Sequence, residues 1–245
     1  MSSTQRSICS FLSSHRGRKR FMEGFLFHYH RVLFPTALYV FSNELTPGEE
    51  FTGYSGVQYR WDSLDDAEPM RANDSRWGLR LFNAVLQLLR EGYDFAIFHP
   101  DDGWILDQQL DRKRLASAWS SLEAHRIDNY RLSEDLTKTH KAEILAEDIL
   151  LLENRWCHHF LTHQTSIWNL RSLLRVLERD TVSSHHEYFG SRRVIELGFR
   201  MAQFSGSPIT DSIGLHWQGT GYDSTRVKRS IALGFSPEGY LPPVC

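Results

Sequence analysis

Short apolar runs alternate with amphipathic stretches along most of the chain. Residues 37–41 (Ala-Leu-Tyr-Val-Phe) and 93–98 (Tyr-Asp-Phe-Ala-Ile-Phe) are rich in strand-forming residues and too short for buried helices. Between them, apolar residues recur at i, i+4, i+8 and i+11 from Trp77, which predicts a helix that Gly92 can end. This order of strand, helix and strand is typical of an α/β protein with parallel strands.

The same alternation continues to about residue 205. Asp111 can cap the next helix, and the apolar residues from Ile127 to Leu132 predict a strand after it. A loop-rich crossover over residues 45–73 carries one further strand at 57–59. In the second half we expect strands at 149–152 and 159–167, a helix on the stripe Leu170, Leu173, Leu174 and Leu177, and a last helix that buries Val194, Leu197 and Met201.

These elements divide the chain into three parts. Residues 1–33 carry arginines among serines without the apolar core of a signal peptide, so we interpret them as a basic, mobile segment. Residues 34–205 form a single α/β domain, in which helices flank a mixed sheet of the Rossmann type. Gly, Ser and Pro are frequent in residues 206–245, which predicts a C-terminal tail that wraps the core or covers a ligand site.

Composition and charge are those of an ordinary globular protein. Of the 245 residues 41% are hydrophobic, and 28 Lys and Arg stand against 30 Asp and Glu for a net charge of −2. This balance argues against general attraction to nucleic-acid phosphates, which needs an excess of positive charge. No apolar run reaches the roughly 18 to 20 residues that span a bilayer. We expect a cytoplasmic protein that acts on small molecules or glycans, with peripheral membrane contact through its basic start as an option.

The cysteines do not indicate a disulfide scaffold or a thiolate metal site. Cys9, Cys157 and Cys245 are odd in number and widely spaced, which favours a reducing compartment. On a strand, Cys157, His159 and His163 would share one face but span about 20 Å, so a zinc site there requires a bend in the chain.

Two adjacent carboxylates are the most informative chemical feature. Asp101 and Asp102 follow a predicted buried strand directly, and ligand sites of open α/β sheets lie at the carboxyl ends of such strands. Mg²⁺ and Mn²⁺ favour carboxylate and phosphate oxygens, and one or two acids suffice when a diphosphate supplies the other ligands. The alternative is an ordinary Asp-Asp-Gly turn after a strand.

The order of these segments resembles the GT-A-type nucleotide-sugar glycosyltransferases, particularly family-two-like bacterial members. The matching pieces are a first strand ending in Ser42-Asn43, a crossover and helix, and a strand that runs into an acidic DxD-like pair at Asp101-Asp102. Further on, Ser166-Ile167-Trp168 precedes a Leu-rich helix, and Glu187-Tyr188 opens another helix. The likeness covers about residues 36–200. One departure is His99-Pro100, which stands where related enzymes continue the apolar strand or add an acid.

The resemblance implies a GT-A-like fold and a metal-assisted, inverting transfer of a hexosyl or pentosyl group from a nucleotide-diphosphate sugar, with a UDP-sugar first among the donors. Asp102 would bind Mn²⁺ or Mg²⁺, and Asp101 would orient the water shell of the metal or the ribose. Glu187 would be the general base for an acceptor hydroxyl, with Asp180 as its substitute if the register slips. The alternative for Glu187 is a carboxylate that only complements the positive end of its helix.

Other residues receive more peripheral roles from the same resemblance. Ser42 and Asn43 would meet the nucleobase, and His216 would add a metal ligand from the C-terminal tail. The tail also carries a basic cluster that could fold over the diphosphate, formed by Arg226, Lys228 and Arg229. We expect the acceptor to lie against His163, Gln164 and Trp168.

Two further classes of function stay open on the sequence alone. The chain could be a non-catalytic glycan- or protein-binding module on a GT-A-like frame, because its aromatic residues suit sugar stacking. The same chemistry could also act on a modified nucleic-acid base, for which the basic start is the support. A nucleophilic hydrolase, a dinucleotide oxidoreductase and a P-loop kinase lack their motifs, since the chain has no G-x-S-x-G, G-x-G-x-x-G or G-x-x-x-x-G-K-[ST]. The sugar, the acceptor and the oligomeric state are not indicated.

Overall fold

The computed structural model describes most of the chain. The described residues are 8–14, 19–32, 36–42, 57–61, 76–101, 103–105, 111–133, 141–155, 160–206, 209, 212–214 and 224–235.

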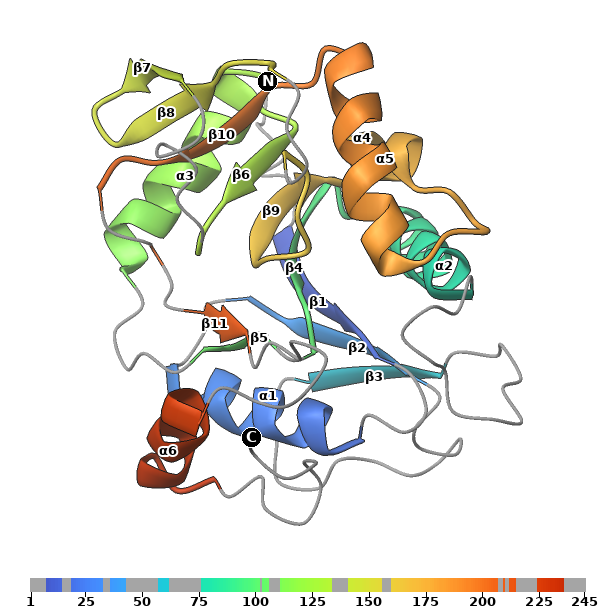
Figure 1. Ribbon diagram of the computed structural model, residues 1–245, viewed down its shortest axis with the longest axis vertical. Helices are drawn as coiled ribbons and strands as arrows, with labels where there is room; N and C mark the ends of the chain where they lie inside the picture. Colours follow the sequence, from blue (N-terminus) through green and yellow to red (C-terminus); the bar gives the residue numbers. More distant parts are fainter. Residues whose placement is uncertain are drawn as a thin grey trace.

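A nine-stranded mixed sheet runs through the centre of the molecule (Figure 1). Its order is β3-β2-β1-β4-β9-β6-β10-β8-β7. Adjacent strands from β3 through β2 and β1 to β4 are parallel to one another, whereas β9 runs antiparallel to both β4 and β6. The strand bounds are β1 Ile8–Ser13, β2 Leu38–Ser42, β3 Val57–Trp61, β4 Phe95–His99, β6 Asn129–Arg131, β7 Ala142–Ala146, β8 Ile149–Leu152, β9 Ser166–Asn169 and β10 Met201–Phe204.

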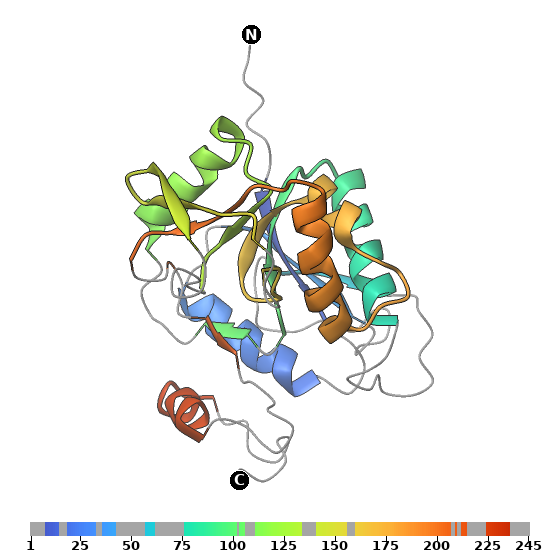
Figure 2. The same ribbon diagram turned by 45° about the horizontal axis from the view of Figure 1, so that its top comes forward.

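Helices cover both faces of this sheet, which explains why β2 and β4 are buried along their whole length. On one face α1 (Lys19–Val32) and α3 (Arg112–Ala124) share a core with Leu12, Val40 and Ile97. On the other face α2 (Arg76–Arg90), α4 (Leu170–Val176) and α5 (Ser183–Glu196) surround Phe11 and Phe98. Figure 2 shows α2, α4 and α5 gathered on one side of the strands and α1 on the other.

A small second sheet and a helix lie beyond α1. The strand β5 (Gly103–Ile105) pairs with β11 (Ser212–Gly214), and α6 (Ser224–Ala232) packs near the later turns of α1. The Trp104 indole donates to the Phe21 carbonyl at 3.0 Å, and its ring lies directly over Gly24. These contacts tie the chain just after β4 to α1.

Most of the predicted elements and the predicted mixed α/β sheet are confirmed. The structure has β2, β3, β4 and β8 where the apolar runs predict strands, and Asp111 caps α3 by accepting from the Arg114 N–H at 3.0 Å. Gly92 follows α2 with a φ of 92°, as a helix-ending glycine requires. Among the described residues, no helix combines the length and the apolar character that a bilayer-spanning segment needs.

The prediction of a mobile segment over residues 1–33 is wrong for residues 8–14 and 19–32. The strand β1 lies between β2 and β4 inside the sheet, and Phe25 and Leu26 of α1 are fully buried. The surrounding arginines give the region a basic composition, but the alternating apolar residues of Ile8–Ser13 and the apolar face of α1 decide its structure.

Two other predictions differ from the structure in the second half. Met201 lies on β10 instead of the helix α5, which ends at Glu196 before a turn with Gly198 at a φ of 65°. The strand expected over 159–167 is shorter and later, because only Ser166–Asn169 pairs with β4 and β6. The residues just before it form an irregular segment, which we call the 160–165 loop. Of the predicted C-terminal tail, the structure describes mainly β11 and residues 224–235.

Candidate functional site

Polar side chains meet where three neighbouring parallel strands end. The register pairs Leu12 of β1 with His99 of β4, and Ser13 with Phe41 of β2, so the residues that follow lie at one edge of the sheet. Ser14 donates through its hydroxyl to Asp101 Oδ2 at 2.8 Å and through its N–H to the Phe41 carbonyl at 2.9 Å. The structure thus brings Ser14 and Asp101 together at the carboxyl edge beside the end of β2.

These groups are held in place by burial. Ser42 at the end of β2 is fully buried, and the exposed fractions of Ser14 and Asp101 are 2% and 7%. A nearly buried carboxylate that accepts a hydroxyl hydrogen bond is fixed in position before any ligand arrives. Ser42 and Asp101 are therefore where the sequence predicts a ligand site, while Ser14 was not predicted.

His99 belongs to the core and does not reach this edge. Its ring is fully buried between Phe25 and Tyr29 of α1, with centroids 5.2 and 5.6 Å away, and Nε2 lies 3.3 Å from the Ser10 hydroxyl. Burial lowers the pKa of His99 to about 3, so the ring is neutral. His99 stands where the resemblance leads us to expect an apolar or acidic residue, and its ring packs against aromatic residues beneath α1.

The 160–165 loop lies at the same edge. Phe98 pairs with Ser166 in antiparallel β4 and β9, so the residues before Ser166 run alongside those that follow Phe98. The Leu132 N–H donates to the Thr165 carbonyl at 3.0 Å, which adds the end of β6. Buried Arg131 donates to the Thr162 hydroxyl at 3.3 Å and to the Phe160 carbonyl. These bonds fix the loop beside the strand that leads to Asp101.

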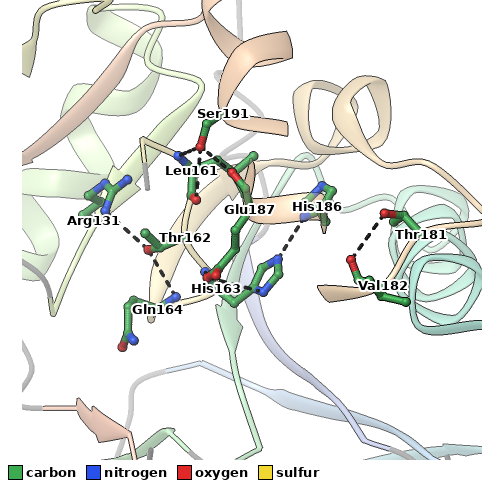
Figure 3. Close-up of polar contacts among 10 residues, drawn as sticks. All are labelled: Arg131, Leu161, Thr162, His163, Gln164, Thr181, Val182, His186, Glu187 and Ser191. Carbon is green, nitrogen blue, oxygen red and sulfur yellow. Dashed lines mark hydrogen bonds and ion pairs between the residues drawn. The ribbon is translucent and has the colours of Figure 1, made fainter. Parts of the chain in front are cut away.

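Glu187 of α5 is bonded to this loop (Figure 3). Its Oε1 accepts from the His163 N–H at 3.0 Å and lies 3.6 Å from His163 Nδ1. Ser191, one turn later, accepts from the Leu161 N–H at 2.8 Å, which anchors α5 a second time. No described residue is hydrogen-bonded to Glu187 Oε2, and the side chain keeps 27% of its surface exposed. One carboxylate oxygen is thus held by the loop, and the side chain is partly exposed.

A second histidine continues the line from Glu187. His163 Nε2 and His186 Nδ1 are 2.9 Å apart, and the two rings are nearly coplanar, with an interplanar angle of 5°. Their centroids are 5.2 Å apart, which is the hydrogen-bond length plus about the two ring radii, so the rings meet edge to edge. Burial lowers the pKa of His163 to about 3. Burial and the neighbouring His163 lower the pKa of His186 well below its usual range, with a small opposing effect of the Val176 carbonyl.

Several predicted site residues lie elsewhere. Trp168 is 2% exposed in the core between β9 and the α2–α4 layer, which corrects the prediction that it lines an acceptor site. Asp180 is exposed in the turn before α5, whereas Glu187 bonds to the loop, so the register favours Glu187. Gln164 sits in the loop with its N–H donated to Thr162 at 3.4 Å.

The predicted tail ligands are only partly described. Lys228 and Arg229 are exposed on α6, which His28 of α1 holds through the Ser230 hydroxyl at 3.0 Å. Asn43, Asp102, His216 and the side chain of Arg226 lie outside the described residues. Their roles, and that of the basic cluster, stay predictions.

Some site residues carry no local signal in the sequence. Ser14 follows a strand inside a basic stretch, and the short apolar run at Ile8–Leu12 is the signal that could have predicted that strand. Arg131 looks like an ordinary polar end of a strand, and His186 is one of two adjacent histidines of which only this one is buried. Their roles arise from contacts between segments far apart in the chain.

The oxygens at the carboxyl edge suit a hard divalent cation. The described oxygens are those of the Asp101 carboxylate and the Ser14 hydroxyl, which match the preference of Mg²⁺ and Mn²⁺ for oxygen. Within the described ranges, no three His, Cys, Asp or Glu side chains converge on one point. The residues thus fit a cation that takes further ligands from phosphate and water.

Solved structures with a similar fold are found at low sequence identity. A cytidylyltransferase from Leptospira borgpetersenii serovar Hardjo-bovis aligns over 96% of this chain and 90% of its own, with 12% identity and a TM-score of 0.50. S. aureus TarS 1–349 aligns over 82% of this chain and 59% of its own, with 11% identity and a TM-score of 0.47. A protein from Desulfovibrio desulfuricans G20, provisionally named a nucleotide-diphospho-sugar transferase, aligns over 81% and 80%, with 10% identity and a TM-score of 0.44.

These comparisons concern the fold. The likeness to the cytidylyltransferase, with the strand order described above, confirms the predicted GT-A-like, Rossmann-type fold. No protein-family model and no curated protein sequence matches the chain.

Proposed function

We propose that the protein is a glycosyltransferase that uses a nucleotide-diphosphate sugar at the carboxyl edge of β1, β2 and β4. The observation that carries the proposal is the placement of two different carboxylates, Asp101 just after β4 and Glu187 bonded to the loop that leads into the neighbouring β9. Asp101 is buried and accepts a hydrogen bond from Ser14, whereas Glu187 is partly exposed and its Oε1 accepts from the His163 N–H. The first is suited to binding and the second to proton transfer.

The donor would lie over the ends of β1, β2 and β4. Ligands of open α/β sheets bind outside the carboxyl ends of the strands, where Ser14 and Ser42 lie. The helix α1 begins at Lys19, a short connection after Ser14, and the positive end of a helix dipole favours phosphate. These features together support a diphosphate at this edge.

A divalent cation fits the donor half of the proposal. Asp101 and Asp102 would hold Mg²⁺ or Mn²⁺ next to the diphosphate, as their oxygen chemistry allows. When bound, such a cation neutralises the charge that develops on a departing nucleoside diphosphate.

Glu187 would act as the general base. The acceptor hydroxyl gives its proton to Oε2 while its oxygen attacks the anomeric carbon, and the bond from that carbon to the diphosphate oxygen breaks. Attack opposite the leaving group inverts the configuration at the anomeric carbon. His163 and Gln164 lie on the loop bonded to Glu187, which makes the 160–165 loop the expected acceptor side.

A thermal-shift panel tests the proposed donor. UDP-, GDP-, CMP- and dTDP-sugars are added with and without Mn²⁺, and a ligand that binds only the native state raises the melting temperature, by about 5 °C at saturation. We expect at least one nucleotide to do so, and more strongly with the cation. No shift for any member at millimolar concentration would contradict the proposal.

A nucleotidyltransferase is the second candidate, because the cytidylyltransferase structure aligns over most of both chains. In that reaction an acceptor oxygen attacks the α-phosphorus of CTP and pyrophosphate leaves. Incubation with CTP and sugar phosphates would then release pyrophosphate, whereas glycosyl transfer releases a nucleoside diphosphate. Nucleotide binding without either product would favour the glycan-binding module.

A further inference from the structure

The rings of His163 and His186 are hydrogen-bonded to each other, and His163 lies next to Glu187. The two rings carry few N–H protons for the hydrogen bonds along this chain of groups. Both rings are neutral because they are buried, so each carries one N–H. One of these two protons lies in the 2.9 Å bond between His163 Nε2 and His186 Nδ1. The position of the other proton depends on which ring donates.

The two arrangements differ in what faces Glu187. If His186 donates, His163 must carry its proton on Nδ1, and this N–H points toward the carboxylate at 3.6 Å. If His163 donates, a bare Nδ1 lone pair faces the carboxylate, and the proton of His186 lies on the buried Nε2. That nitrogen has no hydrogen-bond partner among the described residues, although the Val176 carbonyl is near enough to affect the ring.

Electrostatics decide between these arrangements. A carboxylate carries a full negative charge, and its attraction for an N–H exceeds that of a carbonyl dipole outside hydrogen-bonding geometry. A buried N–H without a partner is also rarer in proteins than a buried acceptor without one. The arrangement with His186 as donor is therefore favoured while Glu187 is ionised.

We propose that His163 and His186 are positioning residues that hold the Glu187 carboxylate for proton transfer. The inference rests on the proposed function. His186 fixes the tautomer of His163, and the backbone N–H and the Nδ1–H of His163 both face Oε1. Oε2 is left to receive the acceptor proton, and no proton leaves the imidazole pair during the reaction.

The aromatic residues packed around the two histidines support a role in orienting the Glu187 carboxylate. Trp77 of α2 packs against both rings, with centroids 4.5 Å from His163 and 5.3 Å from His186, and Phe98 of β4 meets His163 at 6.3 Å. Within the described part of the chain, the titratable groups that face the carboxyl of Glu187 are His163 and, through it, His186.

Replacement of His186 separates the hydrogen bond from the packing. His186→Phe keeps a flat ring but no donor, His186→Asn keeps an N–H near the position of Nδ1, and His185→Phe changes the exposed neighbour on α5 as a control. We expect His186→Phe to lower kcat by about 10- to 100-fold with an unchanged nucleotide Kd, and His186→Asn to recover most of the rate. The control should keep the wild-type rate.

The split between kcat and KM distinguishes positioning from folding. Loss of an N–H that faces the carboxylate leaves the carboxylate of Glu187 less well oriented, so kcat should fall in His186→Phe while KM stays unchanged. A variant that is only less stable would lose melting temperature but keep kcat per folded molecule. An unchanged kcat in His186→Phe would overturn the inference and leave the proposed function standing.

The tautomers can be measured without any activity. Nitrogen-15 NMR of the imidazoles should find the proton of His163 on Nδ1, with Nε2 accepting, and the proton of His186 on Nδ1. A proton on Nε2 of His163 at neutral pH would overturn the inference. If the wild-type protein binds no nucleotide, the proposed function fails, and the spectrum still decides how the two rings and Glu187 are paired.

Discussion

Asp101 is a carboxylate whose position is fixed before a ligand binds. Ser14 donates to one of its oxygens at 2.8 Å, and only 7% of the residue is exposed. A fixed charge at the end of a strand can meet a cation or a ribose without losing side-chain freedom on binding. Ser14 therefore contributes to the site although it carries no charge itself.

Ser14→Ala should weaken nucleotide binding without changing the fold. The substitution removes a hydrogen bond to a charged group, worth about 1.5 kcal/mol, so the Kd for the nucleotide should rise about tenfold. Isothermal titration with and without Mn²⁺ measures this change, and Ser120→Ala on the exposed face of α3 is the matched control. An unchanged Kd would mean that the serine does not orient Asp101 for the ligand.

One close contact joins α2 to the turn before α5, the helix that carries Glu187. Gly78 of α2 donates its N–H to the Thr181 carbonyl at 3.0 Å, just before α5 begins. A Cβ at position 78 would lie 2.1 Å from the Glu178 carbonyl oxygen, which is backbone and cannot rotate away. This contact fixes α5, and with it Glu187, against the layer that contains Trp77.

Gly78→Ala should therefore push the start of α5 away from α2. We expect a loss of about 2 to 3 kcal/mol in the free energy of unfolding, as for an overpacked core position. Urea unfolding measures this loss. Asn83→Ala on the exposed face of α2 should change the value by less than about 0.5 kcal/mol. A fully stable Gly78→Ala protein would contradict the tight packing between α2 and the turn before α5.

Elements with a local signal could be predicted, and those that depend on distant pairing could not. The helix α3 has its cap at Asp111 and α2 its apolar stripe, so both follow from neighbouring residues. The strand β9 enters the sheet between β4 and β6, a position set by contacts with segments distant in sequence. For β1 a basic flank hides the apolar run, so composition led to the wrong prediction.

The residues of the candidate site also divide into those that a local sequence pattern predicts and those that depend on contacts between distant segments. The sequence places Ser42 and Asp101 at strand ends, where the structure has them, and it places Glu187 at a helix start, whereas Glu187 lies in the second turn of α5. The bond from His163 to Glu187 and the contact between Arg131 and Thr162 depend on how the 160–165 loop crosses the edge. Trp168 was assigned to the acceptor side on the strength of the resemblance, but on β9 its ring is buried in the core.

The molecule as a whole has two cores, one on each face of the sheet, and both contain neutral histidines. His28 lies between Trp104 and Phe235 near α6, His99 lies under α1, and His163 lies against Trp77 on the other face. Burial lowers the pKa of His28 to about 4, and that of His99 and of His163 to about 3. Folding thus excludes protons that the unfolded chain would bind.

Stability should consequently fall as the pH falls below about 6.5. Between that ordinary histidine pKa and the lowered values, the unfolded chain binds more protons than the native protein. Each such histidine can reduce the free energy of unfolding by about 1.4 kcal/mol per pH unit. Urea unfolding at pH 7, 6 and 5 measures the slope.

Two variants test whether the buried histidines cause this dependence of the free energy of unfolding on pH. His28→Gln should make it shallower, because this buried group no longer titrates. His185→Gln, at an exposed position on α5, should leave it unchanged. A stability that is constant from pH 7 to pH 5 would contradict the neutral, buried state of these rings.

The account assigns donor binding to Asp101 and proton transfer to Glu187. Isothermal titration of the wild-type protein, Asp101→Asn and Glu187→Gln tests this assignment most directly. The titrant is the nucleotide that gives the largest thermal shift, with Mn²⁺ present. Asp101→Asn keeps an acceptor for Ser14 and removes the charge. We predict binding to the wild-type protein, loss of most of that affinity in Asp101→Asn, and wild-type affinity without sugar transfer in Glu187→Gln. Equal affinity in Asp101→Asn and the wild-type protein would contradict a donor site at this edge.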